Sequence, residues 1–117
     1  MSYIDGFVVP VPKSKLDAYK ELVQKTGPIW KEYGALAYVE CVADDVPYGE
    51  LTSFPRAVQI KDDEIVMFSW IVYESRESRD AAMAKVMADP RLQLDWEKMP
   101  FDGKRMIFGG FKPIIEL

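Results

Sequence analysis

The pattern of apolar residues predicts a buried strand that leads into an amphipathic helix in the middle of the chain. Residues 65–73 are almost all apolar and are mostly β-branched or aromatic, which is typical of a strand covered on both faces. Ser75 follows at the position of a helix N-cap. Pro90 disfavours helical geometry at Asp89, so the helix is predicted to end there. Its apolar stripe consists of Ala82, Met83, Val86 and Met87.

An earlier strand and helix precede this unit. Residues 3–9 read as a strand, and Ser14 stands where it can cap the helix that follows. The apolar stripe continues in phase past Pro28, which predicts a kinked helix rather than two separate ones. Gly34 suits the left-handed position after the helix. The stripe consists of Leu16, Tyr19, Val23, Gly27, Trp30 and Tyr33.

The remaining elements are predicted to be mostly strands. Residues 35–43 alternate as a second strand, and residues 56–60 indicate a strand extension. Residues 61–64 read as the turn of a hairpin into the buried strand. An Asp-Gly turn at 101–104 precedes a last strand over 105–115.

The predicted order is therefore strand, helix, strand, strand, helix, strand. This is the split βαβ, ferredoxin-like arrangement of the α+β class, with a four-stranded antiparallel sheet and both helices on one face. We expect a single domain over residues 1–117. The uncovered face still carries aromatic residues, which is a liability in a monomer. We therefore expect a homodimer formed through the open sheet face.

Composition excludes several function classes. The net charge is −4 and there is no basic stripe, which argues against nucleic acid or an anionic membrane as a partner. No apolar run reaches the roughly 20 residues of a membrane span.

One Cys excludes an internal disulfide framework, and no signal-peptide pattern is seen, so we expect a cytoplasmic protein. The chain has no His, which removes the usual nucleophile–His sites and His-held metals or haem. We expect no cofactor and no metal.

Two acids are candidate catalytic residues. Asp5 and Glu40 lie on the mixed sides of the first two strands. If those sides share one sheet face with Tyr38, Phe68 and Trp70, two carboxylates enter an aromatic cleft. Burial would raise their pKa values and suit either for general acid or base catalysis. The alternative is that they face water or pair with Lys or Arg across the dimer.

A ligand pocket is the other candidate site. The aromatic residues predicted to line a pocket for a small organic molecule are Tyr3, Phe7, Tyr38, Phe68 and Trp70. The alternative for these residues is packing in the core and at the dimer interface. Arg105, after the Asp-Gly turn, is a candidate for holding an anionic ligand, and the alternative is that it lies at a solvated strand end.

Several blocks of sequence resemble one family. Residues 3–12, 30–36, 68–71, 85–91 and 99–111 are together similar to the DUF 1428 family (domain of unknown function) of small bacterial proteins. The resemblance covers essentially the whole chain and implies the dimeric α/β-barrel, ferredoxin-like superfamily. That superfamily includes cofactor-independent monooxygenases, haem-degrading enzymes, isomerases and ligand-sensing domains, but the family has no established activity, so no catalytic residues are carried over.

Three functions stay open at this point. The first is a homodimer that binds a small organic molecule in a cleft between the sheet and the partner. The second is a cofactor-independent monooxygenase- or isomerase-like enzyme that uses Asp5 or Glu40 as acid or base. The third is a non-enzymatic, stress-related interaction module.

Overall fold

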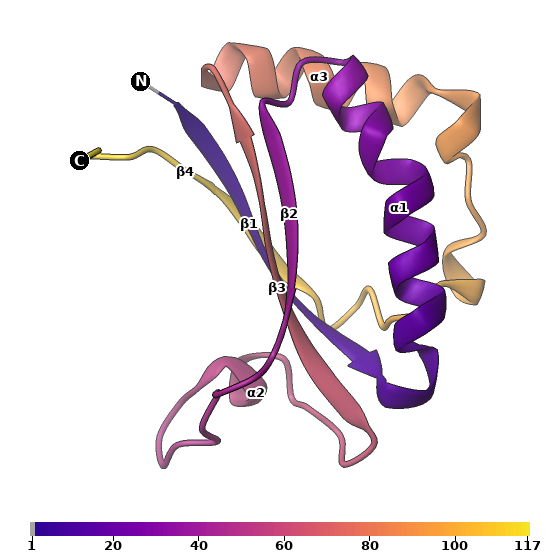
Figure 1. The fold of residues 1–117 in the computed structure, drawn as a ribbon, viewed down its shortest axis with the longest axis vertical. Helices are drawn as coiled ribbons and strands as arrows, with labels where there is room; N and C mark the ends of the chain where they lie inside the picture. The colour runs from indigo at the N-terminus through magenta and orange to yellow at the C-terminus, as the bar shows by residue number, and fades with distance from the viewer. Residues whose placement is uncertain (1) are drawn as a thin grey trace.

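The computed structural model describes residues 2–117, and over that range it shows a sheet covered on one side by two long helices (Figure 1). The four strands pair antiparallel in the order β2-β3-β1-β4. This confirms the predicted ferredoxin-like α+β fold. The main elements are β1 (Tyr3–Pro12), α1 (Leu16–Glu32), β2 (Ala37–Val42), β3 (Glu64–Tyr73), α3 (Arg76–Ala88) and β4 (Ile107–Phe111).

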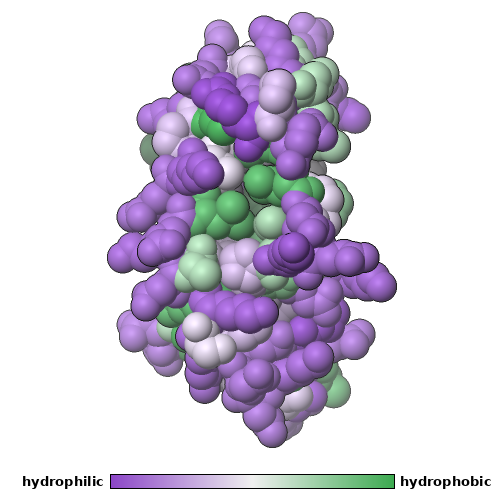
Figure 2. All heavy atoms as spheres, turned by 90° about the vertical axis from the view of Figure 1, so that its right-hand side faces the viewer, coloured by the Kyte–Doolittle hydropathy of each residue, from purple (hydrophilic) through white to green (hydrophobic). Residues whose placement is uncertain are grey.

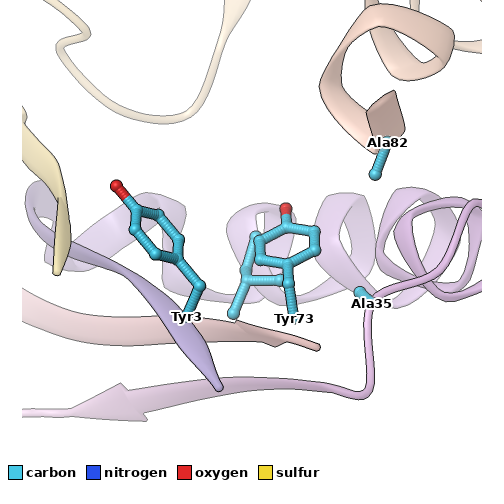
Figure 3. Packing of buried hydrophobic residues seen from close by; sticks show 5 residues of the cluster. Tyr3, Ala35, Tyr73 and Ala82 are labelled. Atoms are coloured by element: carbon cyan, nitrogen blue, oxygen red, sulfur yellow. The ribbon is translucent and has the colours of Figure 1, made fainter. Parts of the chain in front are cut away.

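The core lies between the two central strands and the helices. β1 pairs with β3 from Tyr3 opposite Tyr73 to Pro12 opposite Glu64. Since side chains alternate across a strand, every second residue of both strands lies under the helices. Figure 3 shows Tyr3 and Tyr73 side by side, projecting to the side where Ala82 of α3 lies. A second core cluster on this side consists of Val9, Val11, Tyr19 and Met67.

The first helix runs through its proline. α1 is continuous from Leu16 to Glu32 with Pro28 inside it, so the prediction of one helix is confirmed. Its predicted cap is wrong: Ser14 lies in a short 3-10 turn, and no side chain caps α1. The 3-10 turn moves the helix start past the serine. Gly34 has a φ of 117°, the positive-φ geometry expected after the helix.

The ends of α3 follow the prediction. The Ser75 hydroxyl accepts a hydrogen bond from the Ser78 amide at 3.1 Å, which satisfies one free donor of the first turn. Asp89 is extended, with ψ of 124°, and the helix ends before it. The Tyr33 hydroxyl donates to Asp89 at 2.6 Å and so joins the ends of α1 and α3.

Two predicted strands differ from the structure. The segment after 53 contains a short helix, α2 (Phe54–Ala57), instead of a strand extension, so no hairpin leads into β3. The Ser53 side chain caps α2, accepting from the Arg56 amide at 3.1 Å. The last strand is also shorter than predicted, because Arg105 still belongs to the turn that follows Asp102.

Short 3-10 turns, Pro90–Leu92 and Trp96–Lys98, connect α3 to β4. Within residues 2–117, no helix combines the length and the apolar character that crossing a membrane requires.

Candidate functional site

The sheet separates the residues that were predicted to share one cleft. Asp5 and Tyr38 are both paired with Ile71, so all three side chains lie on the helix side. Phe68 and Trp70 alternate with Ile71 along β3 and therefore lie on the opposite, open face. The predicted combination of carboxylates with these two aromatic residues is wrong. The other predicted site residues on the helix side are Tyr3, Phe7 and Glu40.

Asp5 is held in an ion pair under α3. The residue is 6% exposed, and its Oδ1 lies 2.7 Å from a terminal nitrogen of Arg79. Burial raises the pKa of the Asp5 carboxyl, and the Arg79 guanidinium opposes that shift. Arg79 also lies over the Tyr3 ring, 4.9 Å from its centre. Asp5 therefore links β1 to α3, and its partner Arg79 was not predicted because the sequence places it on a polar helix face.

Glu40 is enclosed by hydroxyl groups from both layers. The Tyr19 hydroxyl of α1 donates to Glu40 Oε1 at 2.6 Å. Burial raises the pKa of Glu40, while hydrogen bonds from Tyr19, Ser69 and Tyr38 partly offset that rise. Aromatic side chains pack around this group: Trp30 meets Tyr38 edge to face at 5.9 Å. Side chains of the chain itself thus occupy the space around this carboxylate.

Arg105 is also engaged within the chain. Its guanidinium forms a two-pronged pair with Glu64, at 2.7 and 2.5 Å, and its Nε donates to Asp102 at 2.8 Å. The bonds from Arg105 to Glu64 lower the pKa of that carboxyl. A terminal nitrogen of Arg105 also donates to the carbonyl oxygens of Val58 and Gln59. Arg105 therefore joins the segment after α2 to the start of β3, and it does not point toward a ligand site.

The open face of the sheet carries an apolar groove of about 760 Å³. Trp70, Gly6 and Gly109 are aligned across β3, β1 and β4, so the floor beside the indole has no side chains over two strands. The Phe111 ring lies over this floor, 3.4 Å from where a Cβ of Gly109 would stand. The walls include Ile4, Phe68, Trp70, Val72, Ile107 and Phe111.

Sequence reasoning found only part of this groove. Phe7, Phe68 and Trp70, which line it, were predicted as ligand residues, whereas Phe111 and the two glycines of the floor were not. The available signal was Gly109 within a predicted strand, because glycine in a strand often marks a close approach of another group. Phe68 is 41% exposed and Phe111 is 63% exposed, so large apolar side chains on this face have no cover.

The helix side has a different surface. Figure 2 views it and shows mostly hydrophilic residues around an apolar hollow near the centre. A shallow groove of about 440 Å³ runs between α1 and residues 98–100, with Lys15, Lys25 and Lys98 at its rim. Among residues 2–117, no cluster of three or more His, Cys, Asp or Glu side chains could hold a metal ion.

Comparison with known proteins gives a consistent family match. A family model described as "Protein of unknown function (DUF1428)" matches residues 2–103. The curated relative "Uncharacterized protein YbaA" of Escherichia coli strain K12 is 57% identical over 116 residues, covering 99% of each chain. The protein of the same description in Shigella flexneri matches at the same level.

Solved structures with the same fold are much more distant in sequence. One, described as a dimeric ferredoxin-like protein from an uncultured marine organism, has a TM-score of 0.64 and 10% identity, covering 100% of this chain and 98% of that one. A NIPSNAP family protein of unknown function from Agrobacterium tumefaciens has a TM-score of 0.59 and 15% identity, covering 96% and 87%. At these identities the likeness shows the fold alone.

Proposed function

This chain belongs to the DUF1428 family of proteins of unknown function, and we propose that it works as a homodimer that binds a small apolar organic molecule on its open sheet face. The observation that carries the proposal is the apolar groove of about 760 Å³ over β1, β3 and β4. A groove of this volume lies within the roughly 300–1,000 Å³ range of small-molecule sites.

The uncovered sheet face supports the dimer. Both long helices pack on the other side of the sheet, so in a single chain the groove residues meet water (Figure 1). A second copy placed on the same face by a two-fold axis covers both apolar surfaces at once. Two of the similar solved structures are described as dimeric ferredoxin-like proteins, which agrees with this arrangement.

The shape of the groove favours a flat, apolar ligand. The Phe111 ring lies over its floor at Gly6 and Gly109, and the Trp70 indole stands beside that floor. A planar ring can stack against these two aromatic side chains, burying its apolar area. The ligand then lies between the sheet and the partner copy.

The enzyme alternative has weaker support. Asp5 and Glu40 lie on the helix side, away from the groove. Arg79 forms an ion pair with the Asp5 carboxylate, and the Tyr19 hydroxyl donates a hydrogen bond to the Glu40 carboxylate. In the part of the chain that the structure describes, no fully buried side-chain nitrogen or oxygen lacks a hydrogen-bond partner, so no unpaired buried group on the helix side indicates a substrate. We therefore assign both acids a structural role.

The test combines ligand binding with sedimentation. N-phenyl-1-naphthylamine, an apolar fluorophore, is titrated into the wild-type protein and into Gly6→Val, which fills the groove floor. We expect saturable fluorescence for the wild type and affinity weaker by at least about tenfold for Gly6→Val. Gly103→Val, a matched change in the turn before β4, is expected to bind like the wild type.

Two outcomes would overturn parts of the proposal. A dimer that shows no saturable fluorescence means that partner side chains fill the groove, and the ligand proposal fails. A monomer at micromolar concentration in sedimentation velocity removes the dimer as well.

A further inference from the structure

Two segments within residues 2–117 carry large apolar side chains that remain exposed. The first is the C-terminal tail, residues 112–117, in which Ile114 is 91% exposed and Ile115 is 72% exposed. The second is the α2 lobe, residues 44–57, where Leu51 is 95% exposed. In the same lobe, Tyr48 is 55% exposed and Phe54 is 50% exposed. Apolar side chains this exposed, grouped in two places, indicate surfaces that another molecule covers.

The two patches lie at opposite ends of the open face. The tail follows Phe111, the last residue of β4, which pairs with Ile4 of β1. Ile4 in turn pairs with Val72 of β3. The α2 lobe packs at the other end of β3, where Phe54 meets Phe68 edge to face at 5.6 Å. From Val66, which packs against Val58 just after the lobe, to Val72 the strand spans about 20 Å. Figure 1 shows the tail and α2 at opposite ends of the sheet, away from α1 and α3.

We propose that the C-terminal tail of each protomer docks on the α2 lobe of its partner. This inference rests on the proposed homodimer. When two open faces meet around a two-fold axis that crosses the strands, the tail end of one sheet comes opposite the lobe end of the other. The contact is then made twice, and each apolar patch is covered by the other.

The lobe is more acidic than the tail. It carries the exposed acids Asp44, Asp45 and Glu50 against the single base Arg56, whereas in the tail Lys112 is offset by Glu116. Within residues 2–117 none of these six side chains forms an ion pair. Lobe-to-lobe contact would bring two acidic patches together, so charge favours the tail-to-lobe register.

Cross-linking tests the contact directly. In a Cys41→Ser background, Leu51→Cys is combined with Ile115→Cys, and the protein is exposed to a mild oxidant. A disulfide requires Cα atoms within about 7 Å. Since the two positions lie at opposite ends of one sheet, the bond can form only between two chains. We expect a covalent dimer on non-reducing electrophoresis from the double variant, and little from either single-cysteine variant.

A second measurement does not depend on engineered cysteines. Ile114→Asp is expected to weaken dimerisation by at least about tenfold in sedimentation equilibrium. Met87→Asp, which changes another exposed apolar residue on α3, is expected to leave it unchanged.

The outcomes separate this inference from the homodimer itself. A wild-type dimer whose double-cysteine variant cross-links no better than the single variants, or that Ile114→Asp leaves intact, shows that the tail docks elsewhere. A monomeric wild type overturns both proposals.

Discussion

Three acids, one on each of the strands β1, β2 and β3, show how neighbouring groups decide the charge of a single residue. Burial raises the pKa values of Asp5 and Glu40, whereas Arg105 lowers the pKa of Glu64. The deciding partners lie far along the chain: Arg79 is separated from Asp5 by 74 positions. The sequence therefore identified Asp5 and Glu40 as notable acids, but it could not identify what they contact.

Glu40 is expected to make stability depend on pH. Its pKa is raised above the ordinary value of 4.5, so the folded protein binds this proton more tightly than the unfolded chain does. The contribution of Glu40 to the free energy of unfolding therefore falls as the pH rises from 4.5 through the pKa of the folded state. Glu40→Gln removes that titration, so wild type is expected to lose stability relative to the variant over this range.

Urea unfolding of both proteins at about pH 4 and about pH 8 measures the effect. Because the other acids titrate equally in both proteins, the difference between the two isolates Glu40. A wild-type-to-variant difference that stays constant between the two pH values would contradict the assignment.

Arg105 is expected to be essential for stability. Its side chain is 15% exposed and that of Glu64 is 4% exposed, so Arg105→Met leaves a buried carboxylate without its partner. Breaking such a pair costs about 3–5 kcal/mol of unfolding free energy. The control is Arg76→Met, since Arg76 and Asp80 are 70% and 59% exposed and such a pair contributes about 1 kcal/mol or less. Equal losses in the two variants, measured by urea unfolding, would refute the role given to Arg105.

At the scale of single elements, local chemistry accounts for most of the boundaries. Ser75 and Pro90 bracket α3 as predicted, because a cap and a proline act on the backbone beside them. The same local signals were present for α2, where Ser53 precedes Pro55 at the helix start. The prediction of a strand extension at 56–60 did not consider this cap.

Two serines that both resemble caps in the sequence are expected to differ in energy. Ser75→Ala removes the hydrogen bond to the Ser78 amide and is expected to cost about 1 kcal/mol of unfolding free energy. Ser14→Ala, the matched change at α1, is expected to stay within about 0.5 kcal/mol because Ser14 caps nothing. Thermal or urea unfolding of both variants decides this, and a larger loss for Ser14→Ala would contradict the helix start at Leu16.

At the scale of the whole molecule, the two sheet faces differ in how they are covered. The helix side is filled by side chains that bond to one another, and the open face presents an apolar groove. The proposed ligand site therefore lies on the same face as the proposed contact with a partner copy.

This arrangement predicts the effect of a charge on the open face. Phe68→Glu puts a carboxylate on the proposed interface, where it loses water without gaining a partner, so dimerisation is expected to weaken by at least about tenfold. Met87→Glu, on the exposed side of α3, is the control and is expected to sediment like the wild type. An unchanged dimer for Phe68→Glu would place the interface elsewhere.

The sequence by itself determined the elements and their order, and through them the ferredoxin-like fold. Helical stripes, caps and prolines act over a few residues, so they can be read along the chain. Only the tertiary structure decided which side of each strand meets the helices. Both sides of β3 are apolar, and a shift of one residue in register exchanges them, so Phe68 and Trp70 could not be assigned to a face from the pattern alone. Ile71 and Ser69 pair with Asp5 and Glu40, so the alternate residues Phe68 and Trp70 lie on the open face, and the candidate site lies there with them.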